Sequence, residues 1–434
     1  MLHKPRIKMK QKSLYIVGCL VLSMATSCIS KVEKEELSNQ KLKQDGMVLK
    51  DETRPIIYRI DSTKIETSKL NEKIQILMDS ASVTGLTISI FNNNQNIYRE
   101  AFGYANFDDR TPLKTNHSFY GASLSKAVFG YLVANLAKEG VLDLDKPLQD
   151  YLDFPLYQLK SGDKWRGFQD LKHDKRYKSI TARMCMSHTT GFQNWRWIDR
   201  PGNFENDNKL KIFFEPGTEC FYSGEGMMLL QYVVEHITGR GLEDLAQEKI
   251  FKPLEMRNTS YLWQERFTDK YCNGHTNKQK VIKKDKRDKA QAAGSMETNL
   301  IDYTLFAKHL LELYKKKSEI TDILFYPSFR IRTKAQFGPL SLEKTTEYDS
   351  IQLSYALGWG RLQSPFGPGV FKEGHGEGFQ HYTILFPEQE MAILIMSNSD
   401  NAESIFKELL EVAIGDIYTP WKWENYVPYN LSDV

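Results

Sequence analysis

Apolar residues near the start of the folded chain follow two different periods. Four of them recur at helical spacing and predict an amphipathic helix: Leu70, Ile74, Leu77 and Met78. Residues 86–90 then alternate between apolar and small polar side chains, which is the period of a β-strand. The turn at 92–94 leads into a second run, Ile97 to Tyr104. Residues 83–105 are therefore predicted to form a β-hairpin.

Strand patterns return only near the C-terminus. They cover four segments: 353–362, 369–374, 381–386 and 391–397. A closing helix is predicted from Ala402 to about Ile417, with Asp400 or Asn401 as its N-cap. Between the two strand regions, from about residue 120 to about 340, the pattern indicates helices and loops.

This order of elements predicts an α+β fold. One antiparallel sheet is built from the N-terminal and C-terminal segments and flanked by helices, and a mainly helical subdomain is inserted between them. We expect a single domain over residues 56–434. Its α/β part covers about 56–115 and 345–434, and its helical part covers about 116–344.

The first 55 residues have a different character. Five Lys or Arg residues and no acid precede an apolar run from Leu14 to Ala25. That run is shorter than the roughly 20 residues needed to cross a bilayer, so residues 1–27 are predicted to be a secretory signal. The alternative is a buried N-terminal helix. Cys28 follows three small residues, which favours lipidation there over cleavage without lipid, and the polar residues 28–55 are expected to form a tether.

These features predict an exported bacterial lipoprotein that is anchored to the membrane through Cys28 and faces the periplasm or the cell exterior. Removal of residues 1–27 takes the net charge from +3 to −2, so a nucleic-acid partner is not expected. Residues 278–289 carry seven Lys or Arg and two Asp. A solvated surface loop is favoured over a binding patch there.

The cysteines of the folded part are too few for a disulfide framework. They are Cys185, Cys220 and Cys272, so one bridge remains possible. Cys185 and His188 have C-x-x-H spacing, but no second pair lies nearby, and no metal site is expected.

The most informative chemical motif is S-x-x-K, although it occurs five times. The five pairs are Ser38/Lys41, Ser123/Lys126, Ser161/Lys164, Ser341/Lys344 and Ser404/Lys407. Ser123 differs from the others because it opens a long apolar helical run. Residues at i and i+3 share a helix face, so Lys126 can reach the Ser123 hydroxyl. The helix dipole and burial both disfavour an ammonium there, which makes Lys126 a candidate base. The alternative is a capping serine with a surface lysine.

The neighbourhood of this pair decides between the two interpretations. Several further segments follow one another in a recognisable order: Phe102-Gly103-Tyr104-Ala105, Ser118 to Lys126, Glu139 to Leu148, Ser187-His188-Thr189-Thr190-Gly191, Glu215-Pro216-Gly217-Thr218, Tyr222-Ser223-Gly224, Ala293-Gly294-Ser295, Gly358-Trp359-Gly360 and Gly374-His375-Gly376. Over about residues 66–415 the succession resembles the β-lactamase-related serine hydrolases, which include class C β-lactamases, penicillin-binding proteins, D-alanyl-D-alanine carboxypeptidases and some esterases.

The resemblance implies roles for further residues. Tyr222 matches the tyrosine of the family's Y-x-N motif, which can act as general acid or base. His375 stands at the start of the third motif, where β-lactamases carry K-T-G and many relatives carry H-x-G. The resemblance also implies an oxyanion hole formed by the N–H groups of Ser123 and of a residue near Gly378. Two residues depart from the family pattern: Gly224 replaces an Asn, and Glu377 replaces a Gly.

We therefore expect a serine hydrolase that acts on an amide or ester through an acyl-enzyme, without a metal or organic cofactor. Its substrate is expected to be a small molecule or a peptidoglycan-like amide. The alternatives are a β-lactamase proper and a non-catalytic binding protein on the same fold. Weak β-lactam hydrolysis is expected, because the family's Asn is absent at Gly224 and its Lys is replaced by His375. A Ser–His triad through His188 is the alternative chemistry.

Overall fold

A computed structural model describes residues 56–161 and 166–431. The predicted signal segment 1–27, Cys28 and the tether 28–55 lie outside these residues. In the part of the chain that is described, no helix has both the length and the apolar character needed to cross a membrane.

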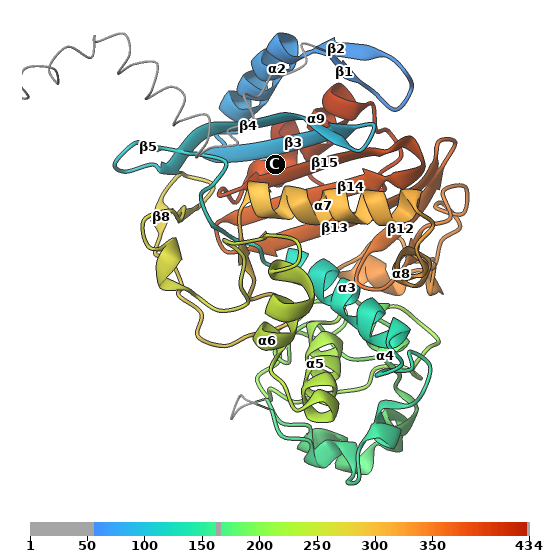
Figure 1. The fold of residues 1–434 in the computed structure, drawn as a ribbon. Helices are drawn as coiled ribbons and strands as arrows, with labels where there is room; N and C mark the ends of the chain where they lie inside the picture. The colour runs from blue at the N-terminus through green and yellow to red at the C-terminus, as the bar shows by residue number, and fades with distance from the viewer. Residues whose placement is uncertain (1–55, 162–165, 432–434) are drawn as a thin grey trace, which may run out of the picture. The chain divides into compact units, whose positions relative to one another are not determined.

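A nine-stranded antiparallel sheet forms the centre of the fold (Figure 1). Its strands, in spatial order, are β10 (Phe329–Arg330), β11 (Ser354–Tyr355), β12 (Gly360–Ser364), β13 (Gly367–Gly376), β14 (Phe379–Phe386), β15 (Met391–Ser397), β3 (Gly85–Asn92), β4 (Gln95–Asn106) and β5 (Thr111–Pro112). The predicted hairpin 83–105 is confirmed as β3 and β4. C-terminal β15 pairs directly with N-terminal β3, so one sheet is indeed built from both ends of the chain.

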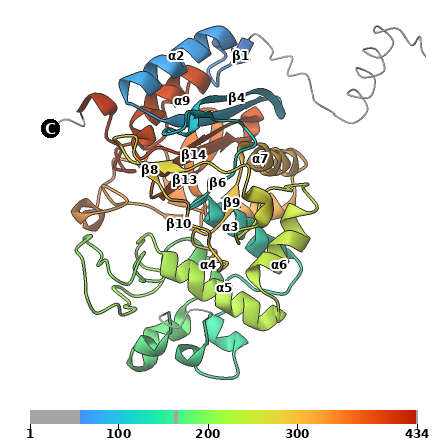
Figure 2. The same ribbon diagram turned by 90° about the vertical axis from the view of Figure 1, so that its left-hand side faces the viewer.

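Two hydrophobic cores lie on opposite faces of the sheet. Successive residues of β15 alternate between them: Ile393 and Ile395 belong to one core, and Leu394 and Met396 to the other. Helices α2 (Thr67–Ser80) and α9 (Phe406–Ile414) cover the first face. Helices α3 (Leu124–Lys138) and α7 (Leu300–Lys315) cover the second (Figure 2). Alternating burial follows from the two-residue period of a strand.

The inserted helical subdomain extends away from the sheet beyond α3 (Figure 1). It contains α4 (Ala182–Met186), α5 (Gly224–Thr238) and α6 (Leu242–Ala246). The predicted α+β class with an inserted helical part is confirmed. However, α7 and β10 lie against or within the sheet although they belong to the segment 116–344, and α8 (Glu319–Leu324) packs against α3 and α7.

Short strand pairs complete the fold. They are β1 (Ile56–Tyr58) with β2 (Lys64–Glu66), β6 (Phe119–Tyr120) with β9 (Glu297–Thr298), and β7 (Gly274–His275) with β8 (Val281–Ile282). The β6–β9 pair leads directly into α3 and so helps to position the start of that helix.

The closing helix differs from its prediction. Residues 402–405 form a 3₁₀ turn, and α9 begins at Phe406 and ends at Ile414, before Gly415 with a φ of 72°. Asn401 lies at the N-cap position of this 3₁₀ turn, as predicted, but its side chain makes no cap hydrogen bond. Its amide donates instead to the carbonyl oxygen of Ala81, a residue near the other end of the folded chain in sequence.

The basic segment 278–289 is only partly a solvated loop. Lys284 is 4% exposed, and its Nζ lies 2.6 Å from Oε2 of the buried Glu297. The Arg287 guanidinium stacks 3.6 Å from the centroid of the Tyr120 ring. The three described cysteines are free, so the disulfide that the sequence left open is not formed among them.

Candidate active site

Lys126 is held beside Ser123 at the start of α3. The chain reaches the helix through Ala122, which has a φ of 45°, and the helix begins at Leu124. Lys126 Nζ lies 2.9 Å from Ser123 Oγ and 2.5 Å from the carbonyl oxygen of Ala293. The lysine is buried, at 1% exposure. The i, i+3 spacing therefore brings the amine and the hydroxyl into hydrogen-bonding contact.

Tyr222 reaches the same site from another element. It precedes α5, whose N-cap is Ser223, and the Ser223 hydroxyl accepts a hydrogen bond from the Gly226 N–H at 2.9 Å. The Tyr222 ring centroid lies 4.9 Å from Lys126 Nζ, and the Ser123 side chain is among the groups that act on the pKa of the phenol. Burial raises the pKa of Tyr222 to about 12. The phenol therefore keeps its proton at neutral pH.

A fourth polar side chain, Lys372, was missed by the sequence analysis. Its Nζ donates a hydrogen bond to the Tyr222 hydroxyl at 3.1 Å. Lys372 lies on β13 just past Phe371, the last residue of this strand that pairs with β12. The signal was present in the sequence, since Lys372-Glu373-Gly374 has K-x-G spacing three residues before His375. A lysine inside an apolar strand is itself uncommon.

The carboxylate of Glu373 balances the positive charge of Lys372 at this position. Lys372 Nζ lies 2.6 Å from Glu373 Oε1, and the two side chains are 1% and 7% exposed. The Gln336 amide donates to the same carboxylate oxygen at 3.4 Å and to the Tyr355 hydroxyl at 2.6 Å. A buried charge is tolerated when it is paired and hydrogen-bonded, and both conditions hold here.

The two lysines consequently differ in charge. Burial, reinforced by the charge of Lys372, holds the pKa of Lys126 well below its ordinary value. Burial acts on Lys372 in the same direction, but Glu373 and Tyr222 outweigh it and raise the pKa of Lys372 above its ordinary value. The site therefore contains a neutral amine beside Ser123 and an ammonium beside Tyr222. Such separated pKa values are typical of groups that act as base and acid.

The side chain of His375 does not join this group. Its Nε2 lies 3.2 Å from Glu403 Oε1, and the side chain is 39% exposed. Burial disfavours its charged form, but Glu403 raises the pKa of His375 above its ordinary value. Side chains of successive strand residues point to opposite faces. The His375 side chain, like those of the other odd-numbered residues of β13, therefore points to the face of the sheet that α9 covers. The Lys372 side chain points to the face that α3 covers.

The backbone of His375, by contrast, borders the site. A Cβ on Gly374 would lie 3.0 Å from the Gly121 carbonyl oxygen, and a Cβ on Gly376 would lie 3.4 Å from the Ala122 Cβ. Strand β13 therefore passes directly beside the turn that carries Ser123.

The direction of the His375 N–H follows from the turn that ends β13. Gly376 pairs with Phe379 across a two-residue turn, and such turns close with a hydrogen bond. N–H groups alternate in direction along an antiparallel strand, so the His375 N–H points away from β14. On that side, the pairing of β13 with β12 stops at Phe371, which lies opposite the first residue of β12.

Gly378 does not supply the expected amide. Its N–H donates to Asp400 Oδ1 at 2.6 Å, and it lies in the two-residue turn between β13 and β14 with a φ of 76°. The geometry instead offers the N–H groups of Ser123 and His375 as the donor pair. Glu377 lies in this same turn.

His188 contacts Tyr222 and not Ser123. The two ring centroids are 4.3 Å apart, and His188 Nδ1 accepts a hydrogen bond from the Ser223 N–H at 3.1 Å. Burial, together with the charges of Lys126 and Lys372, holds the pKa of His188 well below its ordinary value. A neutral histidine in this position supports the Tyr222 ring, and no Ser–His triad is formed.

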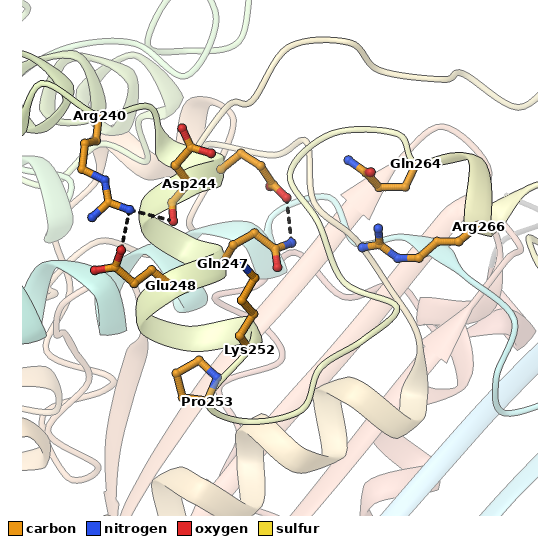
Figure 3. A pocket seen from close by; sticks show the side chains of 9 residues that line it. Arg240, Asp244, Gln247, Glu248, Lys252, Pro253, Gln264 and Arg266 are labelled. Atoms are coloured by element: carbon orange, nitrogen blue, oxygen red, sulfur yellow. Dashed lines mark hydrogen bonds and ion pairs between the residues drawn. The ribbon is translucent and has the colours of Figure 1, made fainter.

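A separate surface cavity of about 590 Å³ contains none of the predicted catalytic residues (Figure 3). Two of its charged side chains, Arg240 and Glu248, pair at 2.7 Å. Among the described residues, no group of three or more His, Cys, Asp or Glu side chains could hold a metal ion.

Comparison with known proteins identifies similar chains. The β-lactamase family model matches residues 70–413. A penicillin-binding protein of Bacillus subtilis is 24% identical over 343 residues, which cover 73% of this chain and 68% of that protein.

Two solved structures share the fold. An octameric penicillin-binding protein homologue from Pyrococcus abyssi has a TM-score of 0.61 at 18% identity, over 83% of this chain and 80% of that chain. A β-lactamase/D-alanine carboxypeptidase from Pseudomonas syringae has a TM-score of 0.61 at 16% identity, over 80% of this chain and 99% of that chain.

Proposed function

Because the chain belongs to the β-lactamase family, we propose that it is a serine hydrolase that cleaves an amide or ester through an acyl-enzyme on Ser123. The observation that carries this proposal is the 2.9 Å contact between Ser123 Oγ and the buried amine of Lys126. A serine hydroxyl is a weak nucleophile until a neighbouring base removes its proton.

In the first step, Ser123 Oγ forms a bond to the substrate carbonyl carbon. Its proton passes to the neutral Lys126 amine, which keeps an N–H for the Ala293 carbonyl and turns its lone pair to the hydroxyl. Negative charge develops on the substrate carbonyl oxygen. The N–H groups of Ser123 and His375 are the donors available to stabilise it.

The bond to the leaving group then breaks, and the leaving group needs a proton. Tyr222 can provide it, because its raised pKa keeps the phenol protonated and because Lys372 donates a hydrogen bond to the phenolic oxygen. Lys372 therefore stabilises the negative charge that Tyr222 acquires as its proton leaves. Water then attacks the acyl-enzyme and gives a proton to the Tyr222 phenolate. The bond between the acyl carbon and Ser123 Oγ breaks, protonated Lys126 returns its proton to Ser123 Oγ, and the acid product leaves.

We propose a small-molecule or peptidoglycan-like amide or ester as the substrate. The name of the Pseudomonas syringae relative includes D-alanine carboxypeptidase activity, which supports a D-alanyl amide as a candidate. Weak β-lactam hydrolysis is expected partly because His375 replaces the family's lysine, and this reason needs revision. A lysine is present at the site, but Glu373 pairs with Lys372 at 2.6 Å and thereby reduces its attraction for a substrate carboxylate.

The test is covalent labelling with a fluorophosphonate. Ser123→Ala should abolish labelling and reduce kcat by several orders of magnitude. Ser404→Ala is the matched control, because Ser404 also begins an S-x-x-K motif. Its hydroxyl donates to the Asn401 carbonyl at 2.6 Å, and Lys407 pairs with Glu411 at 2.7 Å. Labelling that survives in Ser123→Ala would refute the assignment of the nucleophile.

We also propose that Cys28 is lipidated after removal of residues 1–27 and anchors the protein to a bacterial membrane. The support is the basic start, the short apolar run and the small residues before Cys28. Cys28→Ala should move the protein from the membrane fraction to the soluble fraction or leave it unprocessed. Unchanged fractionation of this variant would rule out the anchor.

A further inference from the structure

A short hairpin, residues 197–205, projects from the inserted subdomain. Its strands are joined by a 2.9 Å hydrogen bond from the Asp199 N–H to the Asn203 carbonyl oxygen. At its base, Arg196 Nε lies 3.0 Å from Oε2 of Glu225 in the first turn of α5, and both side chains are buried. A buried, paired charge holds its partner firmly. This first hairpin is therefore fixed to the N-terminal end of α5.

A second hairpin, residues 332–345, lies between β10 and β11. The C-terminal tail holds it in place, because the Gln336 N–H donates to the Trp423 carbonyl oxygen at 2.7 Å. Phe337 follows, and its ring centroid lies 5.4 Å from the ring centroid of Tyr222 at an interplanar angle of 66°. Aromatic rings at this distance are in contact. The second hairpin therefore forms a wall against the side chain that we propose as the acid.

The tips of the two hairpins touch each other. A Cβ on Gly202 would lie 3.8 Å from the Gly338 Cα, which is an ordinary van der Waals distance. The φ angles of these residues are 98° and 72°, in the region that favours glycine, and the backbones can approach because neither carries a side chain. The first tip is also held by Arg200, which lies 2.6 Å from Glu219. We call the two hairpins together the bridge, and both lie on the left-hand side in Figure 2.

The bridge lies on the side of the site where the leaving group departs. In the proposed mechanism, Tyr222 gives its proton to the leaving group, so that group lies next to the phenol when the bond breaks. The second hairpin contacts the Tyr222 ring through Phe337, and the first is fixed to the helix that begins at Gly224. An extended chain adds about 3.3–3.6 Å per residue. A leaving group longer than about one residue would therefore reach past the 5.4 Å between the two ring centroids and meet the bridge.

We propose that the bridge limits the leaving group to about one residue in length. The substrates are then amides or esters of a small amine or alcohol, such as a single terminal amino acid. A chain that continues as a polymer on the leaving-group side is excluded. Phe337 acts as a specificity-determining residue. This inference rests on the proposed function, because Tyr222 marks the leaving-group side only if Ser123 is the nucleophile.

The test compares two acetyl esters that differ only beyond the ester bond. The alcohol is glycolamide in the short ester and glycolyl-trialanine amide in the long ester, so the bond that breaks has the same neighbours in both. Release of acetic acid is followed by titration at constant pH. Forcing atoms into occupied space lowers kcat/KM by roughly tenfold to a hundredfold. We expect wild type to show that loss for the long ester relative to the short one.

Two variants open the bridge from opposite sides. Phe337→Ala removes the ring that contacts Tyr222. In the other variant, an Asn-Gly turn replaces residues 199–203 and shortens the first hairpin. Asn-Gly favours a tight turn between paired strand residues, and Ile198 and Phe204 are such a pair. Each variant should raise kcat/KM for the long ester by about tenfold or more, toward the value for the short ester.

Phe204→Ala is the matched control, because it makes the same substitution on the bridge at a side chain that is 72% exposed. It should leave the ratio of the two kcat/KM values unchanged. Fluorophosphonate labelling of Ser123 shows that the variants are folded. Equal kcat/KM for the two esters in wild type, or a wild-type ratio in either bridge variant, would overturn the inference. If wild type hydrolysed neither ester, or if Ser123→Ala retained hydrolysis, the proposed function itself would fail and this inference with it.

Discussion

Glu373→Gln tests how the site keeps one lysine charged and the other neutral. The substitution preserves the shape of the side chain and an oxygen that can accept from Lys372, but it removes the negative charge. In the structure, Glu373 Oε1 lies 2.6 Å from Lys372 Nζ, and the ammonium is also hydrogen-bonded to Tyr222 at 3.1 Å. The variant therefore isolates the electrostatic contribution of one carboxylate.

The size of the effect follows from the burial of the pair. Two unit charges 2.6 Å apart attract by ~6 kcal/mol at an effective dielectric constant of about 20, before the cost of burial is subtracted. Removing one partner of a buried pair typically costs about 3–5 kcal/mol of unfolding free energy. The retained hydrogen bond places the expected loss near the lower end, at about 3 kcal/mol.

The pH dependence has a definite sign. In wild type, Glu373 raises the pKa of Lys372, so the stability from its charge is present at neutral pH and is lost only as pH rises through that pKa. In Glu373→Gln, burial acts without compensation and lowers the pKa of Lys372. Lys372 then loses its charge at a lower pH. The alkaline limb of kcat/KM should therefore move to lower pH, with a loss of about tenfold to a hundredfold on that limb.

The assay is a pH profile of p-nitrophenyl ester hydrolysis together with urea unfolding at neutral pH. Glu343→Gln is the control, since Glu343 pairs with Lys334 at 2.5 Å but the side chains are 51% and 44% exposed. Exposed pairs contribute about 0–1 kcal/mol, so neither measurement should change appreciably. A folded Glu373→Gln variant whose alkaline limb stays in place, or moves to higher pH, would refute the reasoning.

Three further predictions concern neighbouring groups. Tyr222→Phe should lower kcat by ~10²–10⁴-fold for a D-alanyl amide, whose leaving amine needs a proton, and much less for a p-nitrophenyl ester; equal losses in parallel assays would contradict its role as acid. His188→Leu removes the acceptor of the buried Ser223 N–H, which should cost about 1–3 kcal/mol in urea unfolding, while Ser123 labelling persists; loss of labelling from folded protein would instead support a triad. A chromogenic cephalosporin should have a lower kcat/KM than a p-nitrophenyl ester, since Glu373 neutralises Lys372; a cephalosporin preference of about a hundredfold, the size of one lost charge-assisted contact, would indicate a true β-lactamase.

The sequence by itself determined the features that depend on local periodicity. The four apolar residues of the first predicted helix are the buried residues of α2, and the alternating pattern at 83–105 is the β3–β4 hairpin. The contact between Ser123 and Lys126 belongs to the same class. The helical backbone fixes the geometry of an i, i+3 pair wherever the helix lies, so the spacing alone predicted it.

Only the tertiary structure decided which distant residues meet in the site. The alternation of β13 places Lys372 and His375 on opposite faces, but it does not say which face meets α3, and the resemblance favoured His375. The docking of β13 against the turn before α3 selected Lys372. Phe337 reaches Tyr222 from an irregular hairpin tip, which has no period to read. Contacts of this kind depend on long-range packing, and a spacing rule within one element cannot predict them.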